Sequence, residues 1–139
     1  MSAVRRLTVP GTRDSLAAIL AFVDESCDAL GVPEEAAFAV RLAVEEIATN
    51  VATHGYRDGA GDIGLALAGG DDAVRITIAD RAPRFDPAEA PVPDVAAPLA
   101  ERPSGGLGWH LVNRLMDRVE HQDRPGGGNV VTLTKRYER

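Results

Sequence analysis

One predicted helix constrains this chain more than any other feature. At about 100° per residue, one face of segment 34–54 is apolar, and it carries Val40, Ala43, Val44, Ile47 and Val51. Glu46, Asn50 and His54 follow one another at four-residue spacing, so they form a polar stripe along the edge of that face. An acid, an amide and an imidazole beside the core could line a binding cleft. They could equally be ordinary polar residues at the margin of an amphipathic helix.

Alternating apolar residues predict strands on both sides of a strong hairpin signal. Segments 62–68 and 73–80 flank Gly69-Gly70-Asp71-Asp72, which is typical of a tight turn between antiparallel strands. The second strand ends in Asp80, whose carboxylate serves either a site or the turn itself. The remaining predicted elements are strands 5–9, 117–122 and 130–137 and helices 13–30, 33–54 and 107–116.

A glycine cluster, Gly105-Gly106-Leu107-Gly108, leads into the last predicted helix. Glycines allow a close backbone approach to a ligand, and the free N–H groups of a helix start bind anions, although a plain turn has the same composition. Trp109 follows at a spacing that favours core packing over stacking on a base. Segment 83–105 holds six of the nine prolines without periodicity and is predicted to be a long, mobile loop.

Composition excludes several classes of protein. A chain of 139 residues suits one domain, and a net charge of −6 argues against nucleic acid or an anionic membrane as partner. Lys135 is the single lysine, so a Walker-type phosphate loop is excluded. Cys27 cannot form an intrachain disulfide and occupies an apolar helix position, where we expect it buried and inert. Without an 18-residue apolar stretch or a signal sequence, a soluble cytoplasmic protein is expected.

Four motifs in order carry a family resemblance across nearly the whole chain. They are Glu46-x-x-x-Asn50-x-x-x-His54-Gly55-Tyr56, Asp80-x-Ala82 followed by Phe85-Asp86-Pro87, Gly106-Leu107-Gly108, and segment 129–135. In this spacing the chain resembles the anti-sigma-factor serine/threonine kinases of bacterial partner-switching systems, within the GHKL superfamily of histidine kinase-like ATPases. The resemblance implies a single domain over residues 1–139 with the Bergerat-type ATP-binding fold, an α/β (α+β) two-layer sandwich. Its sheet is expected to be mixed and mostly antiparallel, with helices on one face.

The resemblance also implies roles for individual residues. Asn50 would ligate the Mg²⁺ that accompanies ATP, and Glu46 would be the general base that accepts the proton of a serine or threonine hydroxyl. Asp80 would bind the exocyclic amine of adenine. The remaining nucleotide-binding positions would be His54, Ala82, Gly106, Leu107, Gly108 and Thr132. Thr132 matches the family threonine that supports the adenine side, whereas His54 either lines the site or packs under the lid.

The family motif is usually Asp-x-Gly, and Ala82 stands at its third position. Ala can follow the same backbone path if φ is negative, so the sequence predicts ATP binding that is retained but weakened. Segment 83–105 corresponds to the family's ATP lid. Arg84 or Arg102 would reach the phosphates on closure, although solvated surface arginines are the more common outcome.

The resemblance implies an anti-sigma factor that sequesters a sigma factor and phosphorylates an anti-anti-sigma protein with a STAS domain, as a homodimer. A non-catalytic module, in which ATP only sets the shape of the lid, is the alternative. A third hypothesis is an accessory ATPase with other partners. Phe38 and Leu42, on the side of the helix away from its apolar face, are expected to begin a contact surface.

Overall fold

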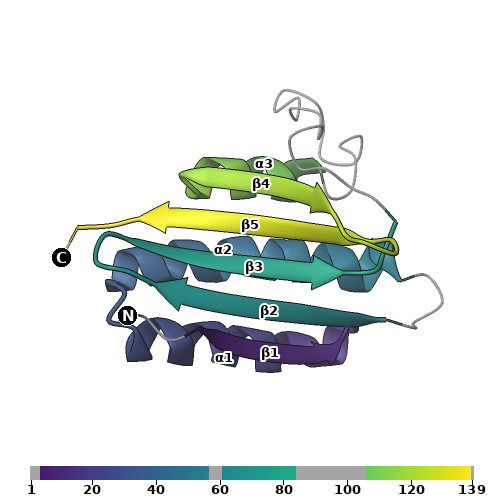
Figure 1. Cartoon of the computed structure of the whole chain (residues 1–139), viewed down its shortest axis with the longest axis horizontal. Helices are drawn as coiled ribbons and strands as arrows, with labels where there is room; N and C mark the ends of the chain where they lie inside the picture. The colour runs from purple at the N-terminus through teal and green to yellow at the C-terminus, as the bar shows by residue number, and fades with distance from the viewer. Residues whose placement is uncertain (1–3, 57–60, 84–105, 139) are drawn as a thin grey trace.

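Residues of alternating burial build one sheet, and helices cover one of its faces. The computed structural model describes residues 4–56, 61–83 and 106–138. The strands are β1 (Arg5–Pro10), β2 (Asp62–Gly69), β3 (Ala73–Asp80), β4 (Arg118–Asp123) and β5 (Asn129–Arg136). In the sheet their order is β1-β2-β3-β5-β4 (Figure 1). The predicted strands are confirmed within one or two residues at each end.

The sheet is antiparallel at all four of its described ladders, which corrects the expected mixed sheet. A parallel pair would have formed if β4 had come back beside β3 after the intervening helix. Instead β5 lies between them and runs against both, so each neighbour is antiparallel. The two-layer α/β class expected from the sequence is confirmed.

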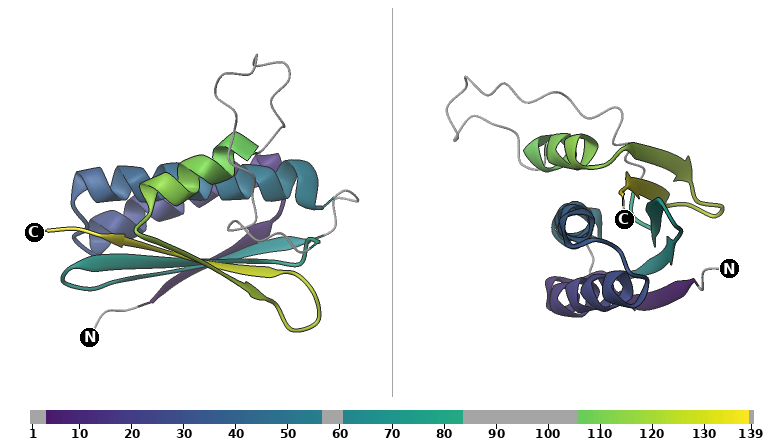
Figure 2. Two further views of the ribbon diagram at one scale, coloured as in Figure 1. Left: turned by 90° about the horizontal axis from the view of Figure 1, so that it is seen from above. Right: turned by 90° about the vertical axis from the view of Figure 1, so that its left-hand side faces the viewer.

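The helices form the second layer of the molecule. A short 3₁₀ turn, η1 (Arg13–Ser15), leads into α1 (Leu16–Ala29), and α2 (Glu34–Asn50) starts after Pro33 with two glutamates in its first turn. One π-helical turn, η2 (Val51–Gly55), extends α2, and α3 (Gly106–Leu115) covers the β4 and β5 side. Figure 2 shows all three helices on the same face of the sheet.

The core lies between these two layers. Ile47 on α2 packs with strand residues of the helix-facing side, and all are nearly inaccessible to solvent: Ile63, Leu67, Val74, Ile76, Ile78 and Leu133. Trp109 is buried in the same cluster, as its spacing predicted, whereas Leu111, two residues further along α3, is exposed. Cys27 is buried too, and desolvation together with nearby Asp24 raises its pKa to about 11. A thiol held protonated in this way is a poor nucleophile, in agreement with the expected inert cysteine.

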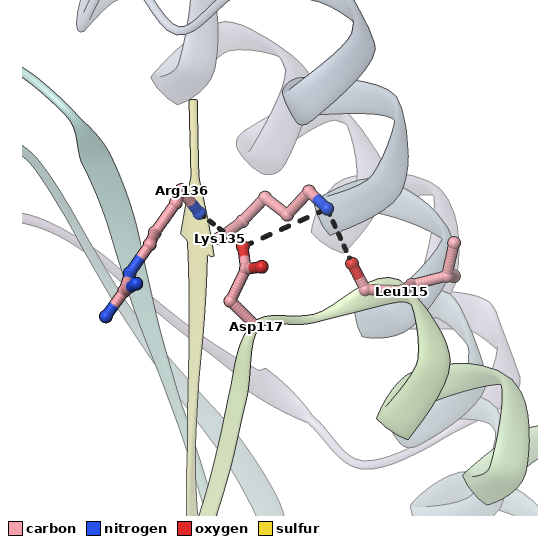
Figure 3. Close-up of polar contacts among 4 residues, drawn as sticks. All are labelled: Leu115, Asp117, Lys135 and Arg136. Atoms are coloured by element: carbon pink, nitrogen blue, oxygen red, sulfur yellow. Dashed lines mark hydrogen bonds and ion pairs between the residues drawn. The ribbon is translucent and has the colours of Figure 1, made fainter. Parts of the chain in front are cut away.

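The far end of the β3–β5 ladder is closed by a polar cluster (Figure 3). Lys135 donates from Nζ to the carbonyl oxygen of Leu115, the last residue of α3, at 2.9 Å. Its Nζ also lies 3.9 Å from the Asp117 carboxylate, which accepts a bond from the backbone N–H of Arg136 at 2.6 Å. The single lysine of the chain therefore caps the C-terminus of α3, where a cation is favourable.

None of the helices in the described part of the chain combines the length and the apolar content needed to cross a bilayer.

Candidate functional site

Several element ends that the sequence places far apart meet at one end of the sandwich. Asp80 ends β3, and it pairs directly with Asn129 at the start of β5. The C-terminal end of α2 and the turn η2 lie at this same end in both orientations shown (Figures 1 and 2). Because α3 ends beside Lys135 at the far end, its first residues point back toward this one. We call this end of the molecule the site end.

The stripe on α2 faces away from α1. Arg41 forms an ion pair with Asp24 of α1, with Nε 3.3 Å from Oδ2. Asn50 lies nine residues beyond Arg41 on the same helix, which is a rotation of about 180°. Since α2 lies between α1 and α3, the side chain of Asn50 belongs to the side that faces α3. Glu46, one turn earlier, shares that side, so the predicted stripe lies on the side of α2 that faces α3 and not on the side that faces α1.

Asn50 carries an unsatisfied polar group. The residue is half-buried, and its Nδ2 is inaccessible to solvent and has no hydrogen-bond partner among the residues that the structure describes. A buried amide nitrogen without a partner costs about 1–3 kcal/mol, so a fold rarely retains one without a use. Glu46 beside it is also half-buried. The amide nitrogen therefore keeps hydrogen-bonding capacity that the described part of the fold does not use.

Asp80 is held rigidly although it is almost fully buried, at 4% exposure. Its Oδ1 accepts two hydrogen bonds, from the backbone N–H of Ala82 at 2.8 Å and from Nδ2 of Asn129 at 3.0 Å. Burial raises the pKa of the carboxyl group, and these two bonds act in the opposite direction by favouring the carboxylate. Within the described chain, Oδ2 has no such donor and remains the acceptor for a ligand.

The backbone after Asp80 is held in place by contacts on two sides. The Tyr56 hydroxyl, just beyond η2, accepts a bond from the backbone N–H of Arg81 and donates to the Asp62 carbonyl at 2.8 Å. On the other side, Gly128 has φ of +117°, and a Cβ there would lie 2.1 Å from the Asp80 carbonyl oxygen. A glycine is required at this close approach. The end of α2 and the β4–β5 turn together fix the position of Asp80.

An open hollow of about 450 Å³ adjoins this segment. Its lining comes from the end of β3 and from the β4–β5 turn, and consists of Arg81, Ala82, Pro83, Asp123, Arg124, Gly127 and Gly128. Two guanidinium groups therefore stand at the edge of the site end, beside the buried carboxylate of Asp80.

The structure separates Thr132 from the other expected site residues. Thr132 pairs with Thr77, three positions from Asp80 along β3. Along β5 the residues Asn129, Val131 and Leu133 are buried, whereas Thr132 alternates with them and belongs to the opposite face of the sheet. The strand position that touches Asp80 is therefore occupied by Asn129 and not by Thr132.

The other expected residues are placed only in part. Ala82 is buried, and no non-glycine residue of the described chain has a positive φ, so its methyl group is compatible with the backbone path. His54 lies in η2 and segment 106–108 opens α3, but the side chains there lie outside the description. The expected lid, apart from Pro83, falls outside the described residues, and so do Arg84 and Arg102. Phe38 is 58% exposed, while Leu42 is half-buried.

Three residues of the site end received no role from the sequence: Asn129 and Tyr56, which stood only as members of motifs, and His121. Asn129 is buried at 3% exposure and contacts His121 as well as Asp80. Strand alternation could have indicated that Asn129 is buried, because residues two apart on a strand share a face and Val131 and Leu133 are apolar. Nothing in the sequence pattern indicated that His121, on a different strand, would reach it.

The donor set fits a magnesium ion that arrives on a nucleotide. The described residues contain no group of three His, Cys, Asp or Glu side chains that could hold a metal ion. Mg²⁺ in phosphoryl-transfer sites uses one or two protein oxygens and completes its shell with phosphates and water. Asn50 would supply one such oxygen from its side-chain amide, whose Nδ2 has no hydrogen-bond partner among the described residues.

Comparison with known proteins assigns the family. A model described as the histidine kinase-like ATPase domain matches residues 9–135 of the chain. The chain therefore belongs to the histidine kinase-like ATPase family. This confirms the superfamily that the four motifs predicted.

Its relatives include proteins named serine-protein kinase RsbW. The protein of that name from Halalkalibacterium halodurans is 30% identical over 96% of this chain and 83% of its own length. One from Bacillus cereus is 29% identical over 72% of this chain, which spans 64% of that relative. The expected enzyme class, a serine-protein kinase with a histidine kinase-like ATPase domain, is confirmed by these relatives.

A solved structure agrees with the fold. The crystal structure of the RsbU and RsbW domains of a Mycobacterium tuberculosis protein superimposes with a TM-score of 0.70 at 22% identity. The match covers 99% of this chain and 33% of the other. At this identity the likeness concerns the fold alone.

Proposed function

We propose that this chain is an ATP-dependent anti-sigma factor that phosphorylates a serine or threonine of an anti-anti-sigma protein with a STAS domain. Phosphorylation would release the antagonist and leave the sigma factor captured, with the chain working as a homodimer in the cytoplasm. The observation that carries the proposal is the buried, unpaired amide of Asn50 at the same end as the anchored carboxylate of Asp80. A family of ATPases whose relatives are named serine-protein kinases supports it.

Asp80 is the residue that we assign to base recognition. Its carboxylate is held through Oδ1, so Oδ2 is oriented before any ligand arrives. An exocyclic amine donates to a carboxylate oxygen, whereas the carbonyl of guanine would place two acceptors against each other. Recognition by a fixed, buried acceptor rejects the wrong base strongly because an unpaired buried group is costly. The site would therefore select adenine over guanine.

Glu46 and Asn50 are the residues that we assign to phosphoryl transfer. The serine oxygen attacks the γ-phosphorus, the bond to the β,γ-bridging oxygen breaks, and Glu46 accepts the hydroxyl proton as ADP leaves. A bound Mg²⁺ supplies charge neutralisation on the phosphates, and Asn50 would hold it through its side-chain oxygen. The backbone N–H groups at the start of α3 would face the phosphates, as helix N-termini do.

The test separates binding from chemistry. The STAS-domain proteins of the same organism are incubated with the chain and ATP labelled at the γ-phosphate, and Trp109 fluorescence follows nucleotide binding in parallel. We expect transfer of label, a loss of at least about 10²-fold in rate for Glu46→Gln, and nucleotide affinity close to the unmodified protein. Asn50→Ala is expected to lose both transfer and magnesium-dependent affinity.

Glu45→Gln is the matched control, because Glu45 is the neighbouring carboxylate on α2 but lies about 100° away from the stripe. It should transfer label at the normal rate. Tight ATP binding without any transfer would support the non-catalytic module. Absence of ATP binding would contradict the proposal altogether.

A further inference from the structure

The amide of Asn129 lies at the centre of a four-way contact. Its Nδ2 lies 3.0 Å from Asp80 Oδ1, 3.1 Å from the Pro83 carbonyl oxygen and 3.3 Å from the Ala82 carbonyl oxygen. Its Oδ1 lies 2.8 Å from Nε2 of His121. One side chain at the start of β5 thus contacts the end of β3, the two following carbonyls and the edge strand β4.

These neighbours leave a single orientation for the amide. A flipped Asn129 would place its carbonyl oxygen against three oxygen acceptors, which is repulsive, so Nδ2 must face them. Oδ1 then faces His121, and the imidazole must donate from Nε2. The amide orientation therefore makes His121 the donor, this contact holds Asn129 from the β4 side, and Asn129 in turn orients Asp80.

The contact also has an electrostatic consequence for the carboxylate. Asp80 is buried, and the hydrogen bond from Asn129 is the largest of the effects that lower its pKa against the cost of burial. Removing the amide would both release the carboxylate from its position and favour its protonation. A protonated carboxyl group is a different hydrogen-bond partner for a purine.

We infer that Asn129 and His121 form a positioning pair, which fixes the Asp80 carboxylate and the turn through Ala82 and Pro83 for recognition of the adenine base. The inference rests on the proposed role of Asp80. In this chain the pair would have the role that the family resemblance implied for Thr132. The pair supplies an amide and an imidazole on the helix-facing side of the sheet, whereas the hydroxyl of Thr132 lies on the opposite side.

The experiment measures the affinities for ATP and GTP by calorimetry, with melting temperatures recorded for each variant. Asn129→Ala should bind ATP about tenfold more weakly and lose much of its preference for ATP over GTP. His121→Leu should show the same loss on a smaller scale. His121→Gln, which keeps an N–H donor of similar reach, should restore affinity and preference to within about twofold.

Gln122→Leu is the matched control for His121→Leu, because Gln122 is the exposed neighbour on the same strand and alternates to the other face. It should leave both affinities unchanged. His121→Leu retains Asn129 and lies on an edge strand, so it keeps the test valid if Asn129→Ala unfolds.

Two results would overturn the inference. One is an Asn129→Ala or His121→Leu protein with unchanged affinity and preference. The other is an equal loss for ATP and GTP that follows the melting temperature, since that is the signature of a general structural role. Asp80→Asn serves as the reference. If it binds ATP normally, the proposed role of Asp80 fails, and if it alone loses binding, the positioning pair fails.

Discussion

The two ends of the β3–β5 ladder both carry polar clusters, and they differ in what they leave unpaired. At the far end, Lys135, Asp117 and the carbonyl of Leu115 satisfy one another (Figure 3). At the site end, Asp80 uses one carboxylate oxygen, and Asn50 Nδ2 has no partner among the described residues. The far end also leaves one buried hydroxyl, that of Thr134, without a partner in the described chain. The contrast therefore concerns the charged groups: the carboxylate at the far end is matched by a lysine, whereas the carboxylate at the site end is held by neutral donors and keeps one oxygen for a ligand.

The largest expected effect on stability comes from separating the β4–β5 turn from the end of β3. Gly128→Ala should destabilise the protein by about 3 kcal/mol or more, because its Cβ would lie 2.1 Å from the Asp80 carbonyl oxygen. Thermal unfolding measures the change. Gly127→Ala is the control, since φ is +106° there but no atom lies within 4 Å of the added Cβ. Similar losses for both variants would show that backbone strain alone is responsible.

A second variant tests whether the unused carboxylate oxygen of Asp80 binds a ligand. Asp80→Asn keeps an acceptor for Ala82 and Asn129 but presents an N–H donor where an adenine amine would donate, so ATP affinity should fall about 100-fold in calorimetry. Asp62→Asn is the control, because the Asp62 side chain is exposed and only its backbone carbonyl, which the substitution leaves in place, contacts Tyr56.

The same variant makes a prediction about pH. Burial raises the pKa of Asp80 in the folded protein. The folded state then binds more protons than the unfolded state, so stability falls as the pH rises through the folded pKa. At pH 7, without nucleotide, Asp80→Asn should therefore melt at a higher temperature than the unmodified protein. This advantage should shrink as the pH falls below 3.8, the ordinary pKa of an aspartate side chain. An advantage that is the same at all pH values would contradict the assignment.

The far end should respond in stability only. Lys135→Met removes the donor to the Leu115 carbonyl and the cation at the C-terminus of α3, which should cost about 1 kcal/mol. ATP affinity should remain unchanged. Arg136→Met is the control, because only the backbone N–H of Arg136 joins the cluster. A loss of ATP affinity in Lys135→Met would show that the two ends are coupled through α3.

The smallest effect is expected from a substitution on β5 between the two polar clusters. Thr132→Val should change stability by less than about 0.5 kcal/mol and leave ATP binding unaltered, because Thr132 belongs to the face of the sheet away from the helices. Denaturant unfolding and calorimetry check the two parts. Weakened ATP binding would reinstate the role that the family resemblance implied for this threonine.

The elements of the fold followed from local signals. Period-two alternation located β2 and β3 with the turn between them, and Pro33 with its two glutamates marked the start of α2. Long-range pairing was less accessible: the mixed sheet that was expected proved to be antiparallel, because the insertion of β5 between β3 and β4 leaves no local trace. The roles proposed for Glu46, Asn50 and Asp80 remain predictions.

The sequence by itself determined the helix that presents Glu46 and Asn50 on one side, the strand that ends in Asp80, and the family. Each depends on residues close together in the chain, where periodicity and spacing are visible. Only the tertiary structure decided that Asn129, and not Thr132, meets Asp80, and that His121 contacts Asn129. Strand register decides such contacts, since a shift of one or three residues turns a side chain to the other face of the sheet.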